Sequence, residues 1–123
     1  MTQKKSLGKR ELMIMNIIWD RSEASVRDVF KEILQNEEVA YTTILSMMQK
    51  LEKKGFLSHR EEGRTYIYAP VIQRNEIETN MLQELVESLF RGSYLNLVNT
   101  VIKNKKLSPA KVEELMQKID REA

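Results

Sequence analysis

The sequence predicts a mainly α-helical protein of two parts, and three observations lead to this prediction. Three segments before residue 55 carry apolar residues at three- and four-residue steps, which is the period of an amphipathic helix. Two short segments with strand character follow, separated by a glycine-containing turn. Beyond Pro70 the apolar residues return to the helical period in three further segments. We therefore expect one domain over residues 1–72 and a second, helical one over residues 73–123.

The first helix is expected over residues 9–20, where a broad apolar stripe is formed by Leu12, Ile14, Met15, Ile17, Ile18 and Trp19. After the charged segment Asp-Arg-Ser-Glu, Ser25 is a good N-cap for a second helix, because its hydroxyl can accept a hydrogen bond from a free backbone N–H. Five apolar residues of this second helix are expected to face inward: Val26, Val29, Phe30, Ile33 and Leu34.

The third helix is expected to begin near Tyr41 and to end at Gly55, which can take the left-handed conformation that closes a helix. One side of it carries Ile44, Met47, Met48 and Leu51. Three helices of this length can share one small core.

Residues 56–60 and 65–69 are expected to pair as a β-hairpin. In the second strand Tyr66 and Tyr68 alternate with Ile67, and the Glu-Glu-Gly-Arg segment between the strands has turn composition. Three helices followed by a hairpin is the order of a winged helix-turn-helix, which is a DNA-binding fold. The alternative is that the hairpin is only a solvent-facing turn.

The three C-terminal segments are expected to form a dimerisation region, because three apolar faces in about fifty residues are hard to bury inside one protomer. The last helix should begin at Ser108 and Pro109, an N-cap followed by a proline in the first turn. The alternative is that these helices pack back onto the N-terminal core. The candidate dimerisation residues are Met81, Leu85, Leu89, Leu97, Val98, Val101, Val112, Leu115, Met116 and Ile119.

The composition excludes several classes of function. The chain has no cysteine and a single histidine, His59, so we expect no disulfide, no metal site and no cofactor. No nucleophile–base pair or glycine-rich phosphate loop is present, which argues against an enzyme. No apolar run approaches the length of a membrane helix, and the basic N-terminus lacks the apolar segment of a signal peptide, so we expect a cytoplasmic protein with no membrane insertion.

The charge pattern favours a nucleic-acid partner. The net charge is only +2, but the whole excess lies within residues 1–70. Residues 39–60 contain one acidic residue, Glu52, and four basic residues: Lys50, Lys53, Lys54 and Arg60. This local excess of positive charge is what a phosphate-binding surface needs. The alternative is an ordinary solvated helix face.

In a helix-turn-helix the second helix of the motif lies in the major groove of DNA. The matching solvent-facing positions here are Tyr41, Thr42, Thr43, Leu45, Ser46, Gln49 and Lys50. Hydroxyl groups can contact base edges or phosphates, threonine methyls and Leu45 can pack on a thymine methyl, and Gln49 can pair with adenine. Tyr41 is equally well explained as a packing residue of the first helical turn.

Other candidate contacts are to the DNA backbone. Lys50, Lys53 and Lys54 suit phosphate or guanine, and Arg64 at the tip of the wing suits the backbone or the minor groove. Ser25 and Arg27 could bring a backbone amide and a guanidinium to a phosphate. His59 is expected to be structural, with pH sensing as the alternative.

Three segments together resemble the penicillinase repressor family, which includes repressors of beta-lactamase and methicillin-resistance genes and copper-responsive repressors. They are ELMIMNIIW (Glu11–Trp19), TTILSMMQKLEKKGFL (Thr42–Leu57) and GRTYIYAP (Gly63–Pro70). The resemblance implies a homodimer with intertwined C-terminal helices, bound to an inverted repeat of TACA/TGTA type that overlaps a promoter. It also implies DNA contacts at Thr42, Thr43, Leu45, Ser46 and Lys50.

The chain departs from the family pattern at several places. A basic residue is usual where Thr42 stands and an arginine where Leu45 stands. The resistance repressors are cleaved at an Asn-Phe bond through a membrane sensor system, whereas the matching place here reads Thr100-Val101. Copper-responsive relatives end in a cysteine-rich motif that this chain lacks. An upstream sensor or protease is therefore not identified.

The functional prediction is a homodimeric bacterial transcriptional repressor that binds a palindromic operator in double-stranded DNA. Two alternatives remain open at this point. One is a winged-helix module that binds a protein partner, since this fold does not dictate one function. The other is a regulator that is released by a small-molecule effector rather than by proteolysis.

Overall fold

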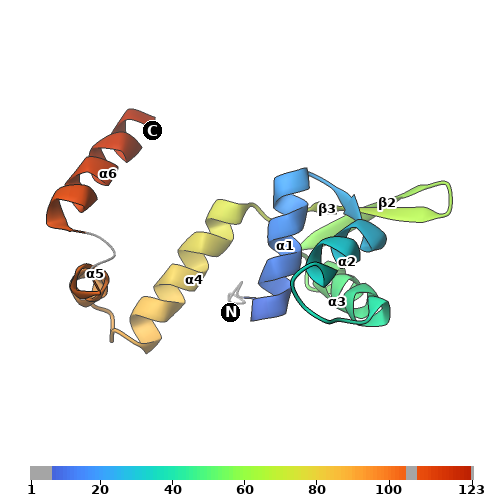
Figure 1. Cartoon of the computed structure of the whole chain (residues 1–123), viewed down its shortest axis with the longest axis horizontal. Helices are drawn as coiled ribbons and strands as arrows, with labels where there is room; N and C mark the ends of the chain where they lie inside the picture. The colour runs from blue at the N-terminus through green and yellow to red at the C-terminus, as the bar shows by residue number, and fades with distance from the viewer. Residues whose placement is uncertain (1–6, 105–107, 123) are drawn as a thin grey trace. The chain divides into compact units, whose positions relative to one another are not determined.

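The computed structural model describes residues 7–104 and 108–122, and the side chains of residues 7–104 and 108–118. The chain divides into two compact units, one that ends at Met81 and one that begins at Leu82. Figure 1 shows the elements, which are in chain order α1 (Lys9–Arg21), β1 (Ala24–Ser25), α2 (Val26–Leu34), α3 (Tyr41–Lys53), β2 (Leu57–Glu62), β3 (Thr65–Pro70), α4 (Arg74–Ser88), α5 (Tyr94–Lys103) and α6 (Pro109–Glu122). The mainly helical fold with a winged helix-turn-helix is therefore confirmed.

The core of the first unit lies where α1, α2 and α3 meet the sheet. Its fully buried side chains come from each of these elements: Ile14, Met15 and Ile18 on α1, Val29 and Ile33 on α2, Ile44, Met48 and Leu51 on α3, and Tyr68 on β3. The predicted apolar stripes of the three helices therefore do share one core. Leu34 is an exception, because its side chain is 47% exposed and the prediction that it faces inward is wrong.

Local signals in the sequence set the ends of these helices as predicted. Ser25 is the N-cap of α2, and its hydroxyl oxygen accepts a hydrogen bond from the backbone N–H of Asp28. Gly55 follows α3 with a φ of 87°, a left-handed conformation that glycine adopts without strain. The backbone N–H of Phe56 can thereby donate to the carbonyl oxygen of Leu51, which closes the helix.

The sheet has three antiparallel strands in the order β1-β3-β2, and the hairpin of β2 and β3 projects from the helices as the wing (Figure 1). The sequence did not predict β1, whose two residues pair with Tyr68 and Ile67 of β3. The predicted four-residue turn is also too long. Glu62 already pairs with Thr65, so only Gly63 and Arg64 form the turn.

The start of α4 is attached to α1 within the first unit. The indole Nε1 of Trp19 donates a hydrogen bond to the carbonyl oxygen of Ile72 at 3.0 Å. Arg74 forms an ion pair with Asp20 at 2.7 Å, and its guanidinium carbon lies 5.2 Å from the centre of the Trp19 ring. Ile77 is buried in the same core. The predicted boundary at residues 72–73 lies in the loop before α4, while the compact unit extends to Met81.

The second unit contains the rest of α4 together with α5 and α6. Ser93 and Ser108 cap the last two helices, each accepting a hydrogen bond at 3.1 Å, from the N–H of Asn96 and of Lys111 respectively. The Ser108 cap is thereby confirmed. The pair Thr100-Val101 lies inside α5.

Apolar side chains of the second unit are extensively exposed in the single chain. The largest exposed ones are Leu82, Leu85, Leu89, Tyr94, Leu95, Val98 and Met116. Of the other candidate dimerisation residues, Leu97, Val101, Val112 and Leu115 are half-buried, Met81 packs against the core of the first unit, and the side chain of Ile119 lies outside the described residues. No helix in the described part of the chain is long and apolar enough to cross a membrane.

Candidate nucleic-acid interface

The outward face of α3 presents polar and basic side chains in a continuous row. Thr42, Ser46, Gln49, Lys50 and Lys53 are all exposed, and their spacing of three and four residues places them on one side of the helix. The opposite side of α3 is held by its buried apolar residues against α1 and α2. The helix therefore offers to solvent a face that combines hydroxyl, amide and ammonium groups.

Two of the predicted site residues lie at the edge of this face. Thr43 is half-buried, and Leu45 is partly buried against the core while one side of it remains accessible. The sequence treated both as fully solvent-facing, and the structure corrects this. Only their outer atoms are available to a partner.

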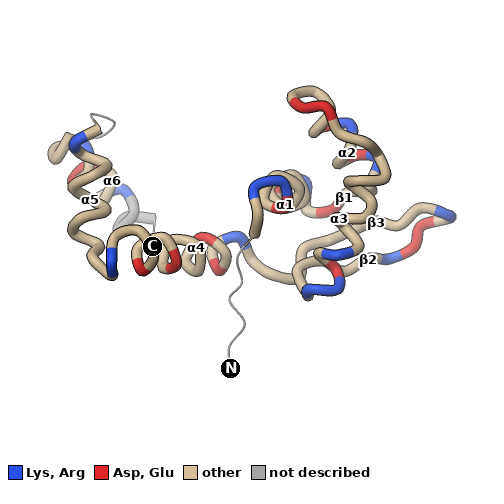
Figure 2. Tube along the Cα trace, turned by 90° about the horizontal axis from the view of Figure 1, so that it is seen from below, with Lys and Arg blue, Asp and Glu red and all other residues tan. Residues whose placement is uncertain are grey.

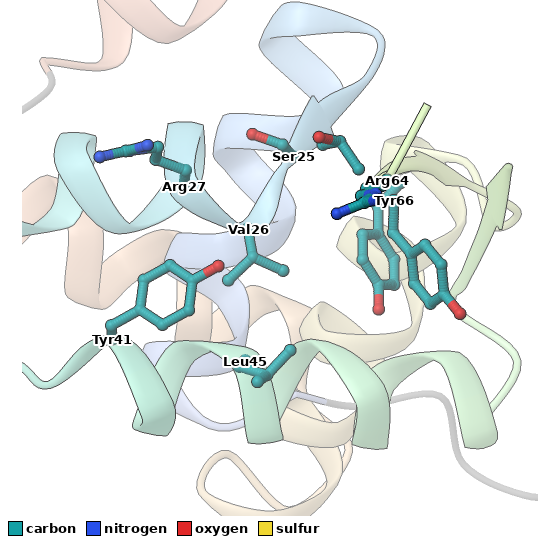
Figure 3. Close-up of a pocket in the computed structure, with 9 residues that line it drawn as sticks. Ser25, Val26, Arg27, Tyr41, Leu45, Arg64 and Tyr66 are labelled. Atoms are coloured by element: carbon teal, nitrogen blue, oxygen red, sulfur yellow. The ribbon is translucent and has the colours of Figure 1, made fainter. Parts of the chain in front are cut away.

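A groove with a volume of about 620 Å³ separates α3 from the wing. Figure 3 shows Tyr41 and Leu45 rising from α3 toward Val26 at the start of α2, with Arg64 and Tyr66 on the wing side. The groove is lined by Ser25, Val26, Arg27, Tyr41, Leu45, Arg64, Thr65, Tyr66 and Tyr68. It thus brings together three separate segments of the chain, each with at least one of the predicted residues.

The basic side chains of the first unit fall into two groups. Four exposed basic residues among the candidate DNA contacts have no acidic partner within ion-pair distance in the described part of the chain: Arg27, Lys50, Lys53 and Arg64. Figure 2 shows the basic tip of the wing, where Arg64 stands in the turn between β2 and β3. These four cations are free to meet phosphate.

Lys54 belongs to the other group. Its Nζ lies 3.0 Å from Oε2 of Glu11 on α1. Burial opposes the charge of Glu11, but a hydrogen bond from the N–H of Gly8 and the charges of Lys54 and Lys50 together lower the pKa of this carboxyl. Lys54 therefore links the end of α3 to α1 through a surface ion pair in which its side chain stays 44% exposed.

Ser25 also has an internal role. Its side chain caps α2, and its backbone N–H donates to Oδ2 of Asp28 at 3.1 Å. The hydrogen bond from this amide is the main cause of the lowered pKa of Asp28, and the nearby Arg21 and Lys31 lower it further. In the free chain the Ser25 amide already donates its hydrogen to the Asp28 carboxylate, and a contact between Ser25 and a phosphate stays a prediction. Arg27, the second residue of α2, is exposed.

The two faces of the wing carry different groups, because side chains alternate across each strand. On one face Arg60 forms ion pairs with Glu23 at 2.9 Å and with Glu62 at 2.8 Å. On the other face His59 contacts Glu52 of α3 and stacks on Tyr66. Arg60, which contributed to the basic pattern in the sequence, is thus held by two carboxylates.

Sequence reasoning missed the contribution of Tyr66 and of the pair formed by Glu52 and His59. Tyr66 was noted only as part of the strand pattern, yet it is 45% exposed and lines the groove. Alternation along a strand places Tyr66 and Tyr68 on the same face, so the pattern alone does not show that Tyr68 is buried and Tyr66 exposed. No group of three His, Cys, Asp or Glu side chains that could hold a metal ion exists among the described residues.

Comparison with known proteins identifies related sequences over nearly the whole chain. The family model described as penicillinase repressor matches residues 7–121. The penicillinase repressor of Bacillus licheniformis is 29% identical over 111 residues, which cover 90% of this chain and 87% of the relative. The methicillin resistance regulatory protein MecI of Staphylococcus aureus (strain N315) is 25% identical over 109 residues, which cover 89% of each chain.

Solved structures match the first unit. The DNA-binding domain of the repressor BlaI, determined in solution, is 33% identical, with a TM-score of 0.54, and the match covers 62% of this chain and 93% of that one. The Bacillus licheniformis BlaI monomeric form in complex with the blaP half-operator is also 33% identical, with a TM-score of 0.52 and the same coverage.

Proposed function

The chain belongs to the penicillinase repressor family, and from this premise we propose that it is a homodimeric transcriptional repressor that occupies an inverted-repeat operator at a promoter. Members of this family are DNA-binding regulators and not enzymes. The proposal places the protein in the bacterial cytoplasm, where the promoter is.

The observation that carries the proposal is the exposed face of α3 beside the groove and the wing. The hydroxyl groups of Thr42 and Ser46 and the amide of Gln49 share this face with Lys50 and Lys53. Neither lysine is paired with an acid among the described residues. An α-helix fits the major groove of B-DNA, so this face is suited to base edges while its lysines approach the phosphates. The related BlaI of Bacillus licheniformis has been solved in complex with a half-operator, which supports DNA binding by this chain.

In this proposal Thr42, Ser46 and Gln49, which are exposed, read the bases. The accessible side of Leu45 and the methyl group of Thr43 would contact thymine methyl groups. Because the family pattern has basic residues at the positions of Thr42 and Leu45, we expect an operator related to TACA/TGTA but altered where these two side chains meet it.

Phosphate binding falls to Lys50 and Lys53 on α3, to Arg27 on α2 and to Arg64 on the wing. Arg27 and Arg64 line the groove between α3 and the wing, and Lys50 and Lys53 line a separate hollow further along α3. With α3 in the major groove of DNA, the four can therefore neutralise phosphates on both edges of that major groove. Each phosphate neutralised releases counterions, and four such contacts predict a log–log salt slope of roughly −3 to −4 per protomer.

Dimerisation falls to the second unit. In the single chain, the Leu89 residue is 67% exposed and the Leu95 residue is 70% exposed. Exposed apolar faces of this extent mark a protein interface. A second copy of the same chain would bury them and would present two α3 helices to the two halves of an inverted repeat.

The proposal is tested by selecting bound sequences from a random duplex library with the full-length protein, followed by a salt titration on the selected duplex. An enriched inverted repeat bound with a steep salt slope is the expected result. Lys50→Ala should weaken binding to all sequences, whereas Thr43→Ala should mainly reduce the preference among sequences. A folded protein that binds every duplex weakly and equally would contradict the proposal and favour a protein-binding module.

A further inference from the structure

Glu52 and His59 join the end of the recognition helix α3 to the first strand of the wing. Nδ1 of His59 lies 2.8 Å from both carboxylate oxygens of Glu52. An ionised carboxylate only accepts hydrogen bonds, so Nδ1 must carry the hydrogen and donate it. Both side chains are about two-thirds buried, at 29% and 32% exposure. This contact is a direct polar link between α3 and β2.

The opposite strand holds the imidazole ring in place. His59 stacks on Tyr66, with ring centres 4.2 Å apart and an angle of 14° between the planes. It also contacts Tyr68, its direct partner in the strand ladder, at 5.5 Å between ring centres. Tyr68 is buried in the core, whereas Tyr66 is 45% exposed, and both line the groove. The imidazole thus connects α3, the core and the exposed side of the wing.

The same pair lies next to the proposed phosphate contacts. Glu52 and His59 line a surface hollow of about 670 Å³ together with Ser46, Gln49, Lys50 and Lys53. A carboxylate at this place opposes the approach of phosphate when the imidazole is neutral. A protonated imidazole cancels that charge without breaking the contact, because Nδ1 donates in both states.

We propose that His59 is a positioning residue that fixes the wing against α3 through Glu52 and Tyr66, and that its protonation strengthens operator binding. This inference rests on the proposed function as a DNA-binding repressor. The groups that face the imidazole are Glu52, Lys50 and Lys53 from α3, Tyr66 and Tyr68 from β3, and Glu61 from its own strand. DNA adds negative charge to this set, so the complex holds the proton more tightly than the free protein does.

The sign of the effect follows from linkage. A site that binds a proton more tightly in the complex makes the affinity for DNA rise as the pH falls. We expect each protomer to contribute about a threefold rise in operator affinity per pH unit between pH 8 and pH 6, below the roughly tenfold limit that one linked proton per protomer sets. His59 is the only histidine of the chain, so its imidazole signals in a proton NMR titration are free of overlap from other histidines.

The experiment measures operator affinity by fluorescence anisotropy at pH 6, 7 and 8 and constant ionic strength. His59→Gln keeps an N–H donor for Glu52 but cannot be protonated, so it should bind like the wild type at pH 8 and show no rise toward pH 6. His59→Ala removes both the donor and the stacked ring, so it should bind about tenfold more weakly than the wild type at pH 8 and, like His59→Gln, show no rise toward pH 6. His59→Gln should restore most of the loss at pH 8. Thermal unfolding of each variant separates loss of the wing contact from loss of the fold.

Glu52→Gln and Glu61→Gln form a matched pair of controls. Each removes one negative charge from the same face of the wing region, but only Glu52 touches His59. We expect the pH dependence to become clearly weaker in Glu52→Gln and to change much less in Glu61→Gln, because only Glu52 is in direct contact with the imidazole. The NMR titration adds a readout that does not depend on any variant, since the imidazole should titrate at a higher pH in the complex than in the free protein.

Different outcomes overturn different claims. A wild-type protein that binds no duplex in a salt-sensitive way would overturn the proposed function and this inference with it. A wild-type protein that binds its operator, with His59→Gln showing the same pH profile, would overturn the inference alone. An imidazole titration that is identical in the free and bound protein would overturn it as well.

Discussion

Ser25 and Asp28 exchange two hydrogen bonds of 3.1 Å, one from each backbone N–H to the side chain of the other residue. This reciprocal arrangement satisfies two backbone donors at the first turn of α2, where no helical partner exists. It also places an acidic side chain near the positive end of the helix dipole. The start of α2, and with it the turn from β1 into the helix-turn-helix, is held by these two side chains.

Removing the hydroxyl of this cap should destabilise the first unit. Ser25→Ala leaves the N–H of Asp28 without its acceptor, and we expect a loss of about 1 kcal/mol in the free energy of unfolding. Urea denaturation followed by tryptophan fluorescence measures it. Ser58→Ala, an exposed serine on β2, is the control and should stay within about 0.5 kcal/mol of the wild type. Equal effects of the two variants would contradict the assigned cap.

Asp28 should contribute to acid denaturation. Its pKa in the folded protein lies below the ordinary value of 3.8, chiefly because the Ser25 amide donates to the carboxylate. A carboxyl whose folded pKa is lowered stabilises the fold fully above its ordinary pKa, and this contribution disappears as the pH falls through the folded pKa. The urea midpoint should therefore fall less in Asp28→Asn than in the wild type between pH 5 and pH 2.5. Glu38→Gln, which also removes one exposed carboxylate, tests whether the difference is specific.

Lys50 on α3 and Lys54, the residue that follows α3, should behave differently toward DNA. Lys50 is exposed and has no acidic partner among the described residues, while Lys54 is paired with Glu11. Lys50→Ala should reduce the log–log salt slope of operator binding by about 0.9 per protomer, the value for one lost phosphate contact. Lys54→Ala should leave the slope nearly unchanged and lower stability by less than about 1 kcal/mol. Anisotropy titrations at four salt concentrations would show an equal loss of slope in both variants if this assignment is wrong.

Ile77 should matter to the stability of the first unit although it lies on α4. Its side chain is only 1% exposed and is part of the core formed by the three N-terminal helices. We expect Ile77→Ala to cost about 2–4 kcal/mol in urea denaturation, the usual loss for a buried isoleucine. Thr79→Ala, at an exposed position of the same helix, should be close to neutral. A small effect at Ile77 would mean that the N-terminal unit is complete before α4.

The exposed leucines of the second unit should hold the dimer together. Leu89→Glu places a charge on a side chain that is 67% exposed in the single chain, so it should disrupt dimerisation without unfolding the protein. Leu34→Glu makes the same change at an exposed leucine of the first unit and should leave the dimer intact. Sedimentation velocity at micromolar concentration distinguishes the two. A monomeric wild type would contradict the dimer, and a dimeric Leu89→Glu would place the interface elsewhere.

The sequence could predict the helices because each one carries its own signals. Apolar periodicity marked the inward faces, and Ser25, Gly55 and Ser108 marked ends that the structure confirms. The order of helices and hairpin was then enough for the winged helix-turn-helix, and the family came from the resemblance of residues 11–19, 42–57 and 63–70 to its members. The assignment of DNA-contacting and dimerisation residues stays a prediction.

The features that the sequence missed all depend on contacts between distant segments. β1 has two residues, too few for any period, and it exists only because β3 offers an edge for pairing. The pairing of Lys54 with Glu11 joins residues 43 positions apart, and nothing local distinguishes Lys54 from Lys50 or Lys53. Leu34 was predicted to face inward but is 47% exposed, because it is the last residue of α2 and its side chain extends beyond the part of the helix that packs on the core.

The hydrogen bond from Trp19 to Ile72 has a practical consequence for measurement. Trp19 is the only tryptophan of the chain, and both its ring contacts and its hydrogen bond lie within the first compact unit. Tryptophan emission is therefore an intrinsic reporter of that unit alone, while far-ultraviolet circular dichroism records the helices of both. A heating experiment that follows the two signals in one sample distinguishes cooperative unfolding of the whole chain, where the curves coincide, from independent melting of the C-terminal helices.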